Sequence, residues 1–140
     1  MRPHPLIAVT SVQSSSLWYQ QLLGCQSAHG GNEYERLTAN GQLILQLHSF
    51  DVHHHHVPIG DRHRKPYGNG VLLWFEVDDF DALVARAAAM QVTVVMPPHR
   101  NPPDGDGGPN HWEIWLRDPD GYLVVASSPD GTAGGDWRPE

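Results

Sequence analysis

The feature that most constrains the fold is an internal repeat of one strand-to-helix opening. Leu72–Val77 is short and apolar, which is typical of a strand, and a helical pattern follows at once. The same change of pattern occurs near the N-terminus, where Pro5–Val9 precedes Ser11, a residue type favoured as a helix N-cap. Val9 corresponds to Val77 at an offset of 68 residues. The repeat predicts a chain built from two copies of one strand–helix unit.

Three further strands complete each copy. The first helix ends at Gly24, a residue suited to the left-handed conformation that follows a helix. The second helix carries one apolar stripe and has Asp78 or Asp79 as its cap. The remaining elements are expected at Gln26–His29, Glu33–Leu37, Gln42–His48, Asp79–Met90, Val92–Met96 and in a final hairpin around Asp118–Gly121.

The loops set the boundaries of the two modules. Module one covers about residues 4–48 and module two about 70–127, with a loop rich in His, Pro and Gly at 49–69. A second loop, rich in Pro and Gly, is expected at 97–109. The 140 residues suffice for one domain, here 1–128, followed by a tail at 129–140 that frays from Ala133 onward.

The final hairpin allows a prediction of which side chains share a face. A three-residue loop at Pro119–Gly121 places Trp115 opposite Val125. Because side chains alternate along a strand, one face should then carry His111, Glu113, Trp115, Leu123 and Val125. The other face should pack on the helix with Trp112, Ile114 and Leu116. By the same alternation, Gln46 lies beside His48, and Leu72 beside Trp74.

Three motifs in order, Ser15–Gly24, Phe75–Asp79 and Asp118–Tyr122, resemble the vicinal oxygen chelate superfamily. This superfamily includes glyoxalase I, extradiol dioxygenases, fosfomycin-resistance proteins and bleomycin-resistance proteins. The resemblance covers residues 4 to 128. It implies an α+β fold in which two βαβββ modules form a curled mixed sheet, a cup around a small-molecule site, with the helices outside. It also implies a homodimer.

The resemblance further identifies the positions that hold a metal in metal-using members of the family. These positions are His4, Gln46, Leu72 and Val125. Leu72 and Val125 have no lone pair to donate, and a well-held Zn²⁺, Fe²⁺ or Mn²⁺ needs at least three protein ligands. We therefore expect no metal cofactor at these positions, as in the metal-free binders of the family such as the bleomycin-resistance proteins.

The cup is expected to bind a small molecule. The candidate ligand-binding residues are Gln46, His48, Leu72, Trp74, His111, Glu113, Trp115 and Val125. Trp74 and Trp115 suit a flat or cationic ligand through stacking or cation–π contacts, although tryptophans in a small sheet also serve as core. The net charge of -7 favours a neutral or cationic ligand and argues against nucleic acid.

Glu113 is the candidate catalytic residue. A carboxylate among aromatic rings can have a raised pKa and act as a general base. The alternatives are an ion pair with Arg100 or Arg117, or simple solvation. Together with His48 and His111, Glu113 could also provide a non-standard metal site of two histidines and one carboxylate.

Two other features bear on partners and location. His53–His56 and His63 lie in the first loop, where they can bind Ni²⁺ or Zn²⁺ adventitiously or simply be solvated. Cys25 is the single cysteine, no apolar run could span a bilayer, and Pro3 and Pro5 interrupt any signal-like segment, so a cytoplasmic protein without a membrane partner is expected.

The leading functional hypothesis is a metal-free protein that binds an apolar or aromatic ligand, neutral or cationic. The alternative is a lyase, isomerase or dioxygenase of the same superfamily that uses non-standard metal ligands or Glu113 as its base. A structural or regulatory module with a collapsed cup is the third hypothesis.

Overall fold

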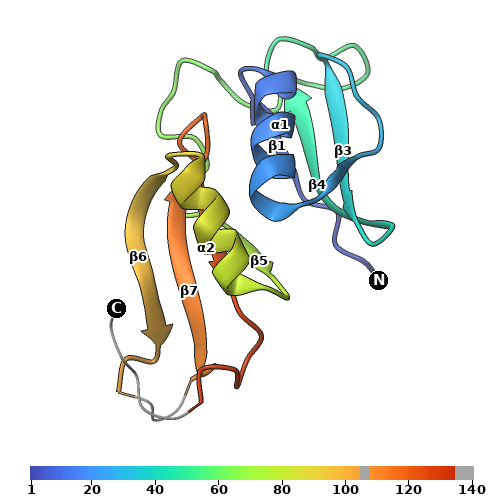
Figure 1. The fold of residues 1–140 in the computed structure, drawn as a ribbon. Coiled ribbons are helices and arrows are strands. Elements are labelled where there is room, and N and C mark those ends of the chain that lie inside the picture. The colour runs from blue at the N-terminus through green and yellow to red at the C-terminus, as the bar shows by residue number, and fades with distance from the viewer. Residues whose placement is uncertain (105–107, 135–140) are drawn as a thin grey trace. The chain divides into compact units, whose positions relative to one another are not determined.

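The computed structural model describes residues 1–104 and 108–134 and divides the chain into two units, Met1–Tyr67 and Gly68–Glu140. Each unit has the element order strand, helix and three strands (Figure 1). The predicted α+β class with two βαβββ modules is confirmed. Neither helix in the described ranges has the length and apolar character that crossing a membrane requires.

The first unit contains a four-stranded mixed sheet with the order β1-β4-β3-β2. Its outer strand β1 runs parallel to β4, and the other neighbours are antiparallel. The elements are β1 (Leu6–Val9), α1 (Val12–Leu23), β2 (Gln26–Ser27), β3 (Tyr34–Ala39) and β4 (Gln42–Ser49).

Both ends of α1 are capped as predicted. The Ser11 hydroxyl accepts a hydrogen bond from the Ser14 backbone N–H at 3.2 Å, which satisfies one of the free donors of the first turn. Gly24 ends the helix with φ 69°, a conformation that costs little only for glycine. Tyr19 and Leu22 on the inner face of α1 are fully buried. The caps and this apolar face together fix the helix against its sheet.

A buried carboxylate, which was not predicted from the sequence, ties several segments of the first unit together. Glu35 on β3 is only 3% exposed, yet its two oxygens accept five hydrogen bonds. The donors are the hydroxyls of Ser16 (2.9 Å) and Ser27 (2.8 Å) and the backbone N–H groups of His29 (3.1 Å), Gly30 (2.9 Å) and Arg36 (2.9 Å). The carboxylate thus links α1, β2 and the turn before β3.

The second unit repeats this topology with the strand order β5-β8-β7-β6, in which β5 is parallel to β8. Its helix α2 has Asp79 as N-cap, since that side chain accepts from the Ala82 N–H at 2.9 Å. The elements are β5 (Leu72–Glu76), α2 (Phe80–Ala89), β6 (Thr93–Asn101), β7 (His111–Arg117) and β8 (Leu123–Ser127).

The loop predicted at 97–109 is wrong for residues 97–101, because β6 continues through Pro97 and Pro98 to Asn101. Proline has no N–H to donate, which disfavours it inside a sheet. Here β6 is an edge strand that pairs only with β7, and its register shifts between Met96 and His99. An edge position and an irregular register both accommodate proline. The extension brings His99 and Asn101 into the sheet.

The tail also begins later than predicted. Ala133 is 3% exposed and its N–H donates to the Asn110 carbonyl at 3.0 Å, while the Gly131 N–H donates to the Pro109 carbonyl. Residue 133 is therefore packed rather than frayed. Residues 105–107 of the predicted loop and 135–140 of the predicted tail lie outside the described residues.

The register of the final hairpin is as predicted. Trp115 lies opposite Val125, and the Asp118 N–H donates to the Tyr122 carbonyl at 3.0 Å. Gly121 has φ 87°, as the three-residue loop requires. Ile114 and Leu116 are buried on the side of the sheet that α2 covers. The opposite face therefore carries the predicted alternate set, which includes Glu113 and Trp115.

Candidate functional site

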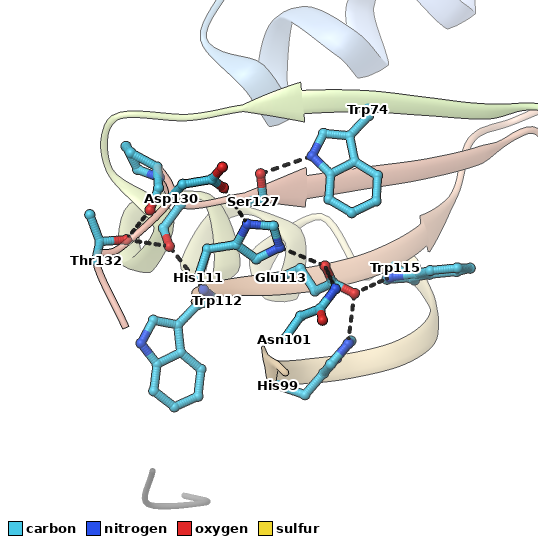
Figure 2. Close-up of polar contacts among 12 residues, drawn as sticks. Trp74, His99, Asn101, His111, Trp112, Glu113, Trp115, Ser127, Asp130 and Thr132 are labelled. Atoms are coloured by element: carbon cyan, nitrogen blue, oxygen red, sulfur yellow. Dashed lines mark hydrogen bonds and ion pairs between the residues drawn. The ribbon is translucent and has the colours of Figure 1, made fainter. Parts of the chain in front are cut away.

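The candidate site is a polar and aromatic cluster around Glu113 on this face of the second sheet (Figure 2). The strand register determines which side chains belong to this cluster. Glu113 lies opposite His99 on β6 and opposite Ser127 on β8. One row further on, Val125 lies between Trp115 on β7 and Trp74 on β5. Since neighbouring strands are about 4.8 Å apart, the two tryptophan backbones are separated by roughly 10 Å.

Glu113 is the centre of the hydrogen-bond network. The residue is 3% exposed, and its carboxylate accepts four hydrogen bonds from side chains. The donors are His99 Nε2 (2.9 Å), Asn101 Nδ2 (3.2 Å), His111 Nε2 (2.8 Å) and Trp115 Nε1 (2.9 Å). Figure 2 shows these side chains converging on the carboxylate from β6 and β7.

The pKa of Glu113 is lowered, contrary to the predicted increase. Burial acts to raise this pKa, but the hydrogen bonds from His111, Trp115, Asn101 and His99 outweigh it because they favour the charged form. The ionised carboxylate is therefore stabilised and is a weak base. The two arginines weighed as alternative partners have other acceptors, since Arg100 donates to Asn110 Oδ1 and Arg117 donates to the Gly121 carbonyl.

The two histidines of the cluster are held at both ring nitrogens. His111 is 3% exposed and lies between two carboxylates, with Nδ1 3.0 Å from Asp130 Oδ1 and Nε2 on Glu113. His99 has Nδ1 2.7 Å from the Pro97 carbonyl and Nε2 on Glu113. Each of the four ring nitrogens therefore has an oxygen partner within the protein, and these contacts fix the orientation of both rings.

The two indoles are anchored by their N–H groups. Trp74 Nε1 donates to Ser127 Oγ at 2.9 Å, and Trp115 Nε1 donates to Glu113 Oε1. Trp74 is nevertheless 44% exposed and Trp115 is half-buried. Because the N–H of each ring is satisfied within the protein, the part of the ring that remains exposed is apolar carbon. Such a surface binds flat or cationic groups.

The remaining predicted residues have less direct access to a ligand. Val125 is fully buried between the two tryptophan strands, whereas Leu72 is 39% exposed. In the first unit, Gln46 accepts a hydrogen bond from the Tyr34 hydroxyl and donates to the His4 carbonyl at 3.1 Å. His48 lies on the same strand and contacts His56.

Two of the four positions that the family uses for a metal carry side chains without a donor atom in this chain. Leu72 and Val125 carry only carbon atoms, and the Gln46 amide is already engaged at both ends. Within the residues that the structure describes, no group of three or more His, Cys, Asp or Glu side chains could hold a metal ion. The suggested triad of His48, His111 and Glu113 spans both units and remains a hypothesis.

Sequence reasoning missed His99, Asn101 and Asp130. The first two were assigned to a loop because Pro97 and Pro98 precede them, and Asp130 was assigned to the tail. The sequence does contain a signal for the first two. His99 and Asn101 are two residues apart, as are His111 and Glu113, and this spacing places side chains on the same face of a strand. The missed residues supply two of the four donors to Glu113 and the carboxylate that holds His111.

Trp112 provides a test of the assigned faces. It lies on β7 with its ring directed away from the Glu113 cluster, on the face where Ile114 and Leu116 are buried (Figure 2). We expect Trp112→Ala to lower the free energy of unfolding by about 1–3 kcal/mol, since a half-buried indole loses part of its packing. Urea denaturation measures this change. Loss of ligand binding without loss of stability would contradict the assignment.

Comparison with known proteins agrees with the observed fold. The family model for the Glyoxalase/Bleomycin resistance protein/Dioxygenase superfamily matches residues 2–126. No curated protein sequence gives a match. Many solved structures have a similar fold.

Three of these structures illustrate the range of the fold. Lactoylglutathione lyase from Agrobacterium tumefaciens is 15% identical, with 91% of this chain and 92% of that chain covered and a TM-score of 0.61. The fosfomycin resistance protein FosX from Listeria monocytogenes is 12% identical, with 95% and 96% covered and a TM-score of 0.65. TioX from Micromonospora sp. ML1 is 16% identical, with 99% and 100% covered and a TM-score of 0.59. At these identities the similarity shows the fold alone.

Proposed function

Because the chain belongs to the glyoxalase/bleomycin resistance protein/dioxygenase superfamily, we propose that it binds a flat apolar or aromatic small molecule without a metal ion at the family positions. The ligand is neutral or cationic, and it binds on the sheet face that carries Trp74 and Trp115. The similar structures include a lyase and a resistance protein, so fold alone does not select a function. The function must therefore be inferred from the side chains of the candidate site.

The observation that carries the proposal is the pair of anchored indoles. Both N–H groups are committed to protein acceptors, which orients the rings before a ligand arrives. Preorganised aromatic surfaces bind with little loss of side-chain entropy. Val125 lies between the two tryptophans in the register but is fully buried, so the surface that a ligand can reach there belongs to the indoles. A planar molecule can therefore stack on one or both indoles.

The state of Glu113 favours binding over catalysis. A general base needs a pKa near the working pH and access to the proton that it removes. Glu113 has a lowered pKa, is buried, and has four donors on its two oxygens. We propose that Glu113 positions Trp115 and the two imidazoles rather than acting as a base. A cationic ligand would meet the indole faces, with the carboxylate as a nearby but covered charge.

Screening by thermal shift in the presence of a chelator tests this function. We expect aromatic compounds, neutral or cationic, to raise the melting temperature, because a ligand at 100 times its Kd stabilises by about 2.7 kcal/mol. The stabilisation should persist in excess EDTA. The proposal would be contradicted if every stabilising compound lost its effect in EDTA, or if one equivalent of metal depended on His4 and Gln46.

Two further properties belong to the proposal. The resemblance implies a homodimer, and the single cysteine fits a cytoplasmic protein. Light scattering coupled to size-exclusion chromatography measures the oligomeric state directly.

A further inference from the structure

Two histidines of the first unit direct their Nε2 atoms at each other. His48 Nε2 and His56 Nε2 are 3.1 Å apart, with ring centroids separated by 4.8 Å. His48 lies half-buried on β4, and His56 lies in the loop that follows. The two residues come from different structural elements, so the contact is not a result of sequence adjacency.

The other nitrogen of each ring determines what this contact can be. His48 Nδ1 is 2.8 Å from the Ser49 carbonyl, and His56 Nδ1 is 2.7 Å from the Val57 carbonyl. A carbonyl only accepts, so each Nδ1 carries the hydrogen. The two Nε2 atoms are then left to bind one partner between them, a proton or a metal ion.

The geometry points to a divalent metal ion, and we propose that His48 and His56 are two ligands of a Zn²⁺-type site. Metal–nitrogen bonds of about 2.0–2.1 Å to atoms 3.1 Å apart give an angle at the metal of roughly 95–100°. This angle suits adjacent positions of a tetrahedral or octahedral ion. The Nδ1–H to carbonyl contacts match the orientation that metal-binding histidines require.

The site is distinct from the family positions and from the Glu113 cluster. Both of its histidines belong to the first unit, and neither is His4 or Gln46. Water would fill the remaining coordination positions, since no third His, Cys, Asp or Glu side chain among the described residues completes a metal-holding group. Imidazole ligands favour Zn²⁺, Ni²⁺ and Cu²⁺ over Mg²⁺ or Ca²⁺. Two protein ligands predict exchangeable binding that is weaker than at a structural zinc site with four.

Titration with Zn²⁺ alone, on protein purified without a metal-affinity column, tests the proposal. We expect wild-type protein to bind Zn²⁺, and both His48→Gln and His56→Gln to weaken binding by at least about tenfold, since even outer partners of a metal change affinity by about 10- to 100-fold. In a shared site the two losses are not additive, so the double variant should bind about as weakly as either single variant.

His54→Gln is the matched control. It lies in the same exposed loop and its ring neighbours His55 rather than His48. If the histidine run bound zinc as an ordinary polyhistidine segment, His54→Gln would weaken binding and His48→Gln, outside the run, would not. That result overturns the proposal, as does wild-type protein that binds no Zn²⁺. His56 is exposed, so His56→Gln keeps the test decisive even if His48→Gln fails to fold.

Discussion

Replacement of Glu35 by alanine is expected to lower the free energy of unfolding by at least about 3 kcal/mol. Burial acts to raise the pKa of this carboxyl, but its hydrogen bonds lower it from 4.5 to about 2. A depression of that size corresponds to about 3 kcal/mol of stability in the charged state. Alanine would also leave the half-buried N–H groups of Gly30 and Arg36 without this acceptor.

The sign of the pH dependence follows from the same values. Because the folded pKa is below the unfolded one, the contribution of Glu35 is fully present above about pH 4.5 and is lost as the pH falls toward 2. Glu35→Gln keeps the shape and an acceptor oxygen, so we expect a smaller loss of stability than for alanine. It should also flatten the fall in stability between pH 4.5 and 2.

Urea denaturation at several pH values measures both effects. Glu33→Ala is the control, since Glu33 is exposed in the turn before β3 and surface substitutions change stability by about 0.5 kcal/mol or less. Equal losses for Glu33→Ala and Glu35→Ala, or an unchanged acid response in Glu35→Gln, would show that the buried network does not stabilise the first unit.

The second large effect concerns ligand affinity. We expect Trp115→Ala to weaken binding of a stabilising compound by at least about tenfold. For a cationic compound the loss should approach about thirtyfold, because a desolvated cation–π contact contributes about 2 kcal/mol. The fold should survive, since Trp115 is half-buried and Glu113 keeps its other three donors. Fluorescence titration gives the Kd of each variant.

Trp112→Ala is the matched control for this affinity change. The two tryptophans are on the same strand and are both half-buried, but they lie on opposite faces of the sheet. Trp112→Ala should therefore lower stability while leaving the Kd within about twofold. If Trp112→Ala weakens binding and Trp115→Ala does not, the ligand binds on the helix side and the proposed site is wrong.

The parts of the fold that the sequence predicted are those with strong local signals. Ser11 and Asp79 act as caps, and Gly24 ends a helix because of its positive φ. The turn at Asp118–Gly121 fixes the hairpin register, which in turn fixes the face of every residue on β7. These features depend on neighbours within a few residues, so they can be recognised without a structure.

The errors arose where tertiary contacts override local preference. Pro97 and Pro98 normally interrupt a sheet, but an edge strand with an irregular register tolerates them. Without β6, the donors His99 and Asn101 were missing, so Glu113 was expected among aromatic rings with a raised pKa, and that direction was wrong. The Glu35 network was missed for a related reason, since its donors come from α1, β2 and a turn that meet only in the folded unit.

The indole N–H resonances of the five tryptophans, assigned by single Trp→Phe variants, test directly whether a ligand binds at Trp74 and Trp115. A compound that stabilises the protein in EDTA is titrated into uniformly ¹⁵N-labelled protein. We expect the resonances of Trp74 and Trp115 to shift together and to follow one saturation curve that gives the Kd, while those of Trp18 and Trp112 stay in place. Saturable shifts confined to Trp18 or Trp112, with Trp74 and Trp115 unmoved, would contradict this expectation.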